Sequence, residues 1–320
     1  MSVYKYFSPE NAERYLTTWA MRLTPPNRVN DPFEMRPSFD AFSEAAVQKF
    51  LSTRAQDLSK EVAMKIAAKL PHKSEGTNNP ALSALARYLF DCETEEDLAT
   101  LLQITSSAEL HAIRVQAQKA IYDQLPTWNS DTENALRQSA AESLGMLCLS
   151  GSSNNPLMWA HYAKSHEGVV VEFDENHPTF HRRRSSVDEF GYLRRVSYAD
   201  TRPSISKIDG NDTFIQLAFV KGLDWAYEQE HRMIWPLSLA DCSKSIGEET
   251  IYLLEVPALA VKSLTFGCKA EASFTQQIVQ ILSQNKDAGH IQVYQSFVST
   301  DTFALCYQPY QGVDNEALSK

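Results

Sequence analysis

The sequence predicts an α+β protein in which a mixed or antiparallel β core is interrupted by a large helical insertion. Short apolar and aromatic runs with the spacing of strands lie near both ends of the chain. About a hundred residues between them show helical spacing instead. A hydrophobic content of 43% suffices for a sizeable core. We therefore expect a core domain built from residues 1–39 and 144–320, and a helical insertion or subdomain at 40–143.

The N-terminal part predicts a strand, a helix, a second strand and a turn. Residues 3–7 have strand character, and Ser8 followed by Pro9 is a typical start of a helix, which should run to about residue 20. A short strand follows at 21–24. The Asn30-Asp31-Pro32 sequence favours a turn, in which the Asn and Asp side chains would accept hydrogen bonds from nearby backbone N–H groups.

The chain after Gly145 predicts most of the remaining sheet. We expect strands at 146–150, 169–173, 195–198, 225–236, 251–256, 263–266, 291–297 and 303–308. We expect helices at about 214–221 and 271–285, and a short helix beginning at Pro156 with Asn154 or Asn155 as its cap.

Charge and composition exclude several classes of protein. The sequence contains no apolar run of 18 residues, so no membrane span is expected. The formal net charge of −10 argues against a general DNA-binding protein. The five cysteines are widely spaced without a CxxC, and the N-terminus lacks an apolar signal core. A cytoplasmic protein is therefore expected.

The stretch 225–236 carries the most unusual charge pattern of the chain. As a strand it would place Glu228, Glu230, Arg232 and Ile234 on one face. Two carboxylates this close need a cation nearby, and Arg232 is a candidate. The pattern fits either an exposed ladder of salt bridges or a functional site.

Other chemical motifs are missing from the sequence. No zinc-binding spacing, P-loop, GxSxG or GxGxxG is present, and we expect no bound metal. The Arg182-Arg183-Arg184 run is either a solvated loop or a contact for phosphate.

Several segments together resemble the bacterial family called domain of unknown function 2971. The segments are Tyr4-Lys5-Tyr6, Asn30 to Glu34, Met158 to Tyr162, Gly168 to Phe173, Tyr227 to Arg232 and Phe266-Gly267. They span nearly the whole chain apart from the helical block. The family name implies no activity.

The order of the segments also resembles the ADP-ribosyltransferase fold, particularly the DarT-like toxins that modify DNA. Lys5-Tyr6-Phe7 stands in the place of their N-terminal His-Tyr-Thr strand, and Leu149-Ser150 leads to Pro156-Leu157-Met158 in place of their Ser-Pro-Met segment. Their catalytic glutamate begins a strand with apolar residues after it, and here Glu230 precedes His231-Arg232-Met233-Ile234. Lys5 departs from the histidine or arginine of that family.

This second resemblance implies a β core of the ADP-ribosyltransferase type and an enzyme that uses NAD. A carboxylate beside the ribose would stabilise the positive charge that develops as nicotinamide leaves. Glu230 would be the catalytic carboxylate and Glu228 its helper. The residues expected to bind the cofactor are Tyr4, Lys5, Tyr6, Ser150, Met158, Trp159, Tyr162 and Arg232.

The resemblance further implies a toxin or phage-defence effector whose acceptor is a nucleic acid or a protein. Two alternatives stay open. One is a module without catalysis that binds a nucleotide, another small molecule or a protein. The other is a metal-dependent nuclease that uses Asp31, Glu34, Glu228 and Glu230.

Overall fold

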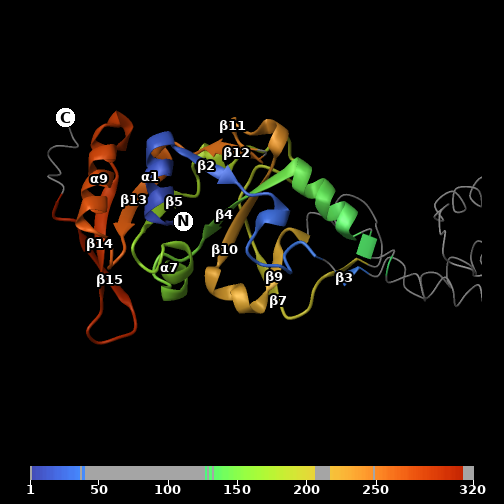
Figure 1. Ribbon diagram of the computed structural model, residues 1–320, viewed down its shortest axis with the longest axis horizontal. Coiled ribbons are helices and arrows are strands. Elements are labelled where there is room, and N and C mark those ends of the chain that lie inside the picture. The colour runs from blue at the N-terminus through green and yellow to red at the C-terminus, as the bar shows by residue number, and fades with distance from the viewer. Residues whose placement is uncertain are drawn as a thin grey trace, which may run out of the picture. The chain divides into compact units, whose positions relative to one another are not determined.

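A computed structural model describes residues 2–36, 38–39, 127, 130–131, 133–205, 217–247 and 249–312 (Figure 1). The chain divides into two compact units. The first comprises Met1–Pro37, Ala135–Pro203 and Asp209–Lys320. The second comprises Ser38–Asn134 and Ser204–Ile208, and of this unit the strands β3 (Ser38–Phe39) and β8 (Ser204–Ile205) form a parallel pair. Most of the predicted helical insertion at 40–143 lies outside the described residues, so that boundary stays a prediction.

The first unit is built on an eight-stranded mixed sheet in the order β15-β14-β13-β5-β1-β4-β10-β6. Only the β13–β14 pair is parallel among these neighbours. The strands are β1 (Ser2–Phe7), β4 (Leu144–Ser150), β5 (Val169–Asp174), β6 (Arg194–Arg195), β10 (Glu230–Pro236), β13 (Val261–Phe266), β14 (Gln292–Val298) and β15 (Leu305–Pro309). The structure confirms the α+β class with a mixed sheet.

Two smaller groups of strands complete the described part of this unit. One is a three-stranded antiparallel sheet of β11 (Cys242–Ile246), β12 (Glu249–Glu255) and β2 (Ala20–Leu23). The other is the parallel pair of β7 (Ser197–Ala199) and β9 (Val220–Gly222). The β11 strand, which is exposed along its whole length, was not predicted.

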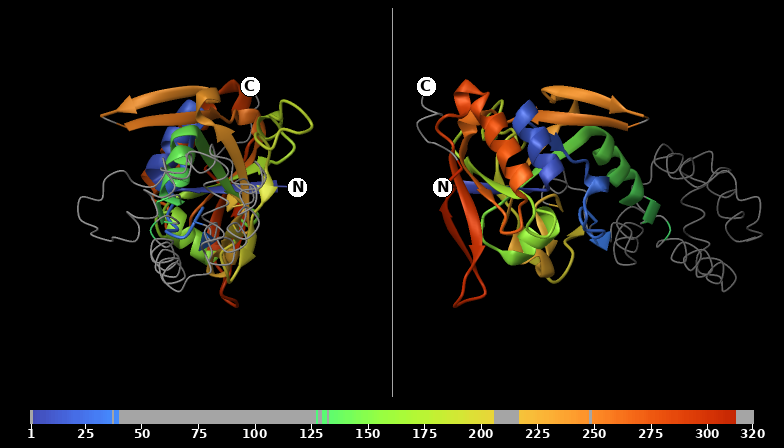
Figure 2. Two further views of the ribbon diagram at one scale, coloured as in Figure 1. Left: turned by 90° about the vertical axis from the view of Figure 1, so that its right-hand side faces the viewer. Right: turned by 60° about the vertical axis from the view of Figure 1, so that its left-hand side comes forward.

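Two helices cover one face of the large sheet. Helix α1 (Pro9–Thr18) and helix α9 (Ala272–Ser283) lie side by side there, as Figures 1 and 2 show. Alternate strand residues such as Val171 and Met233 join Tyr15 and Ile278 in the main hydrophobic core. The cap of α1 is as predicted, since the Ser8 side chain accepts a hydrogen bond from the Asn11 N–H group.

The opposite face of the sheet carries the short helix α7 (Pro156–Tyr162), which Asn155 caps. Residues 133–143 form a further helix that leads into β4. Short 3-10 turns make up the other described helical segments: η1 (Pro26–Arg28), η2 (Pro178–Phe180), η3 (Leu223–Glu228), η4 (Leu237–Leu239), η5 (Ala258–Ala260) and η6 (Lys286–Ala288). No helix among the described residues is long and apolar enough to cross a bilayer.

A glycine permits the close approach of β1 and β5. A Cβ atom on Gly168 would lie 1.9 Å from the Phe7 carbonyl oxygen. The contact is with backbone, so a side chain could fit only if the strands moved. A Cβ atom on Gly222, in contrast, would have its nearest neighbour at 3.8 Å, a carbon of the Trp225 ring.

We expect Gly168→Ala to lower the free energy of unfolding by about 1–3 kcal/mol, as overpacking of a tight interior does. Gly222→Ala is the matched control. It should leave stability unchanged or raise it by up to about 1 kcal/mol. Urea unfolding followed by circular dichroism measures both. Equal stability of the two variants would contradict this account of the β1–β5 approach.

Candidate functional site

The predicted strand at 225–236 begins only at Glu230. The preceding residues form η3, and Gln229 joins the two elements in the left-handed conformation, with φ 46°. The sequence prediction was wrong here because the aromatic side chains of this segment favour a strand locally. Tertiary hydrogen bonds prevail instead: Ser150 Oγ donates to the Glu228 carbonyl at 2.6 Å, and Gly151 N–H to the Gln229 carbonyl at 2.8 Å.

Glu228 and Glu230 nevertheless meet at a lysine. Lys221 Nζ donates to Glu228 Oε2 at 2.6 Å and to Glu230 Oε2 at 3.3 Å. It also lies 3.9 Å from Glu34 Oε2 and 4.6 Å from the centre of the Trp225 ring. All three glutamates and the lysine are at most 5% exposed. The pair is therefore a buried site and not an exposed ladder.

Sequence reasoning missed Lys221 because it assigned residues 214–221 to a helix. Lys221 lies on β9, whose parallel pairing with β7 aims the side chain at the glutamates. Residues 206–216 lie outside the described part of the chain. A three-residue strand such as β9 leaves little periodic signal in a sequence.

Arg232 is the second cation of the group. It is fully buried, and its Nε and Nη2 donate to Glu230 Oε1 at 2.9 and 2.8 Å. Its Nη1 donates to the Ala218 carbonyl at 2.6 Å, and Nη2 pairs with Glu34. Arg232, the cation predicted to lie near the two carboxylates, thus binds the Oε1 atom of Glu230 from the buried side of the cluster. We call Glu34, Lys221, Glu228, Glu230 and Arg232 the buried ion cluster.

Tyr162 connects the cluster to a less buried region. Its hydroxyl donates to Glu228 Oε1 at 2.5 Å and accepts a bond from Asn30 Nδ2 at 2.7 Å. Asp31 behaves as the predicted turn clamp, since its Oδ1 accepts from the Phe33 N–H group at 2.9 Å. Asn30, predicted to serve the same turn, reaches Tyr162.

Burial and the two cations act in opposite directions on the carboxylates. Burial alone would raise the pKa of Glu230, but Arg232 and Lys221 outweigh it and lower the pKa to about 2. For Glu34 burial prevails over Arg232 and raises the pKa. The described cluster holds three carboxylates against two cations.

The remaining predicted site residues lie on β1, β4 and α7. Tyr4, Ser150 and Glu230 are direct partners on the neighbouring strands β1, β4 and β10, and so form a row on one face of the sheet. The Tyr6 hydroxyl donates to the Ser152 carbonyl at 2.8 Å. Lys5, which neighbours Tyr4 on β1, donates to the Cys148 carbonyl at 2.7 Å.

Trp159 and Met158 are core residues. Trp159 is fully buried, its Nε1 donates to the Ser153 carbonyl, and its ring packs edge-on against Tyr6 at 5.4 Å. Trp159, expected among the cofactor-binding residues, lies in the core beside Tyr6, and its role in binding stays a prediction. Tyr162, half-buried on the same helix, is the α7 aromatic residue that reaches the ion cluster.

Two other predictions concern anions and metals. The arginine run bonds within the chain: Arg182 pairs with Asp241, Arg184 with Asp188, and Arg183 donates to the Asp188 carbonyl. No group of three potential metal ligands occurs in the described parts of the chain. Lys221 and Arg232 pair with Glu34, Glu228 and Glu230, which are three of the four carboxylates on which the nuclease alternative depends.

Comparison with known proteins supports the first resemblance. Residues 158–233 match the family described as "Protein of unknown function (DUF2971)", as the sequence analysis predicts. The match runs from α7 to β10 and so includes Tyr162 and four of the five members of the ion cluster. No curated protein and no solved structure matches the chain.

Glu230 makes the stability of the protein depend on pH. Its folded-state pKa of about 2 lies below its ordinary value of 4.5, so its contribution is fully present above about pH 4.5 and is lost as pH falls toward 2. We expect the free energy of unfolding to fall over that window, and Glu230→Gln to make the fall less steep. Chemical unfolding between pH 2 and 6 measures it. Parallel profiles for the two proteins would contradict the assignment.

Proposed function

We propose that this chain is an NAD-dependent transferase of the ADP-ribosyltransferase type. The observation that carries the proposal is the row of Tyr4, Ser150 and Glu230 on three adjacent strands. These residues come from the three segments that the resemblance selects, and they lie far apart in the sequence. Their direct pairing is what a shared binding site for one ligand requires.

The charge of the cluster supports the proposal. In the transfer, the bond between the nicotinamide nitrogen and the ribose C1′ breaks, the electron pair goes to the nicotinamide, and the acceptor forms the new bond at C1′. Positive charge develops at the ribose, and a site with excess negative charge stabilises it. Three carboxylates against two cations give the cluster that sign.

The geometry suggests different roles for the two glutamates. Both oxygens of each glutamate accept hydrogen bonds: those of Glu230 from Arg232 and Lys221, and those of Glu228 from Tyr162 and Lys221. The low pKa of Glu230 makes it the weaker choice of base. Glu228 bonds to the half-buried Tyr162, on the accessible side of the cluster. We assign to Glu228 the role of the base that takes the proton from the acceptor. Glu230 provides fixed negative charge and positions the two cations.

The residues around this row fit the chemistry of NAD. The phenol rings of Tyr4 and Tyr6 lie on the same face of β1, and the Tyr162 hydroxyl stands beside Glu228. Aromatic rings supply stacking surfaces for a base or a nicotinamide, and the carboxylates supply acceptors for ribose hydroxyls. A toxin or phage-defence role stays a prediction from the resemblance.

Nicotinamide release from NAD tests the proposal. We expect Glu228→Gln to slow release by about 10²- to 10⁴-fold, the range of general acid–base catalysis, without loss of the folded state. Glu13→Gln, an exposed change on α1, is the control. If the wild-type protein neither releases nicotinamide nor gains thermal stability with millimolar NAD, the proposal fails.

A second candidate function is a ligand-binding module without catalysis. The burial of Glu228 and Glu230, each 4% exposed, favours it. This function predicts that NAD raises the melting temperature while no nicotinamide is released. At 100 times its Kd a ligand stabilises the folded state by about 2.7 kcal/mol, which such an experiment resolves.

A further inference from the structure

A cavity of about 310 Å³ lies next to the buried ion cluster and is not used by the proposed transfer. Three segments of the first unit line it: residues 31–36, 199–203 and 217–224. Glu34 and Lys221 are the cluster members that face it, whereas Tyr4, Ser150 and Glu230 are not among its lining residues.

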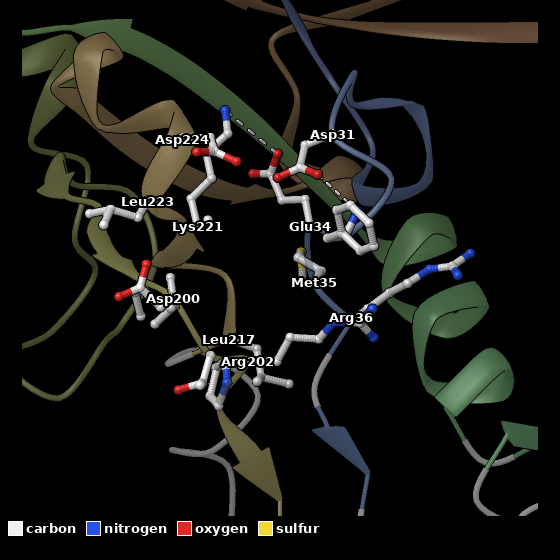
Figure 3. A pocket seen from close by; sticks show the side chains of 16 residues that line it. Asp31, Glu34, Met35, Arg36, Asp200, Arg202, Leu217, Lys221, Leu223 and Asp224 are labelled. Atoms are coloured by element: carbon white, nitrogen blue, oxygen red, sulfur yellow. Dashed lines mark hydrogen bonds and ion pairs between the residues drawn. The ribbon is translucent and has the colours of Figure 1, made fainter.

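One side of the cavity is negatively charged. Asp31 and Glu34, both only 2% exposed, lie there with Lys221 and Asp224 (Figure 3). Lys221 Nζ is closer to Glu228 and Glu230 than to Glu34, so it neutralises mainly these two carboxylates and less the one that faces the cavity. Together with Asp31, the cluster holds four carboxylates against two cations. Glu34 pairs with Arg232, but four carboxylates against two cations leave an excess of buried negative charge, so this side favours a ligand that brings a positive group.

The opposite side of the cavity carries the guanidinium group of Arg202, and the exposed Asp200 also belongs to the lining. Figure 3 shows Arg202 across from Glu34 and Asp31. The Arg202 guanidinium lies 5.1 Å from the centre of the Phe33 ring. Guanidinium groups bind carboxylates and phosphates with two parallel hydrogen bonds. This side favours a ligand that brings a negative group.

Apolar side chains separate the two charged sides. Met35 and Leu217 are both buried; Met35 lies between the two sides, and Leu217 lies beside Arg202. A ligand that satisfies all three features has an ammonium group, an anionic group and a short hydrocarbon part.

We infer that this cavity binds a small zwitterion of the amino-acid type. The ammonium group pairs with Glu34 and Asp31, the carboxylate pairs with Arg202, and the hydrocarbon side chain lies against Met35 and Leu217. This cavity is distinct from the proposed NAD site. The two share only Lys221 and Glu34, which belong to the ion cluster and also line the cavity. The inference does not depend on transfer chemistry.

Isothermal titration in the absence of NAD tests the inference with three related compounds. L-Leucine carries both charges, isoamylamine lacks the carboxylate, and N-acetyl-L-leucine lacks the ammonium charge. We expect L-leucine to bind at least tenfold more tightly than either analogue. If all three bind equally, or if L-leucine does not bind, the inference is wrong.

A protein variant tests the positive side separately. Arg202→Gln should weaken L-leucine binding at least tenfold and leave isoamylamine binding unchanged. The exposed Arg14→Gln on α1 is the matched control and should change neither. Equal L-leucine affinity in the wild-type and Arg202→Gln proteins would overturn the assignment of the carboxylate to this side. Because the titrations contain no NAD, these results are independent of the proposed transferase activity.

Discussion

The arrangement of the site depends on one buried ammonium group. Lys221 bonds to Glu228 and Glu230 and lies within 4 Å of Glu34, and these glutamates come from η3, β10 and the turn after η1. The like charges repel one another, so these three segments approach only because Lys221 and Arg232 lie between them. Without Lys221, the same backbone would hold three buried carboxylates against one arginine. The position of the β9 strand is therefore a condition for the whole cluster.

The cluster links two regions of different character. On one side Tyr162 joins Glu228 to the sheet face that carries Tyr4 and Ser150. On the other side Glu34 and Lys221 line a cavity with charges of both signs. A ligand in either region would act on the same ion pairs. Buried networks of this kind give geometric specificity more readily than stability, because the removal of five charges from water costs much of what their attraction returns.

The sequence predicts those elements that are determined by the spacing of apolar residues and by capping residues within the element itself. The α1 helix with its Ser8 cap, β5, α9 and the α+β class all follow from spacing and capping residues. It also identifies Glu230 and Arg232 as a charged pair on one strand face. It fails where tertiary contacts decide: η3 replaces the first half of a predicted strand, and Lys221 lies on a strand too short to show a period. The sequence points to Glu34 as part of the Asn30 to Glu34 segment and as a carboxylate of the nuclease alternative, but nothing in the turn sequence indicates that Arg232 is its partner.

A double-mutant cycle between Lys221 and Glu228 tests the central claim most directly. Lys221→Met, Glu228→Gln and the double variant are unfolded in urea at pH 7. A bonded, buried pair predicts a coupling energy near the upper end of the range of about 0.5–3 kcal/mol found for residues in contact. The double variant should then be more stable than the sum of the single losses implies. Additive losses, with a coupling energy within about 0.3–0.5 kcal/mol of zero, would contradict the account.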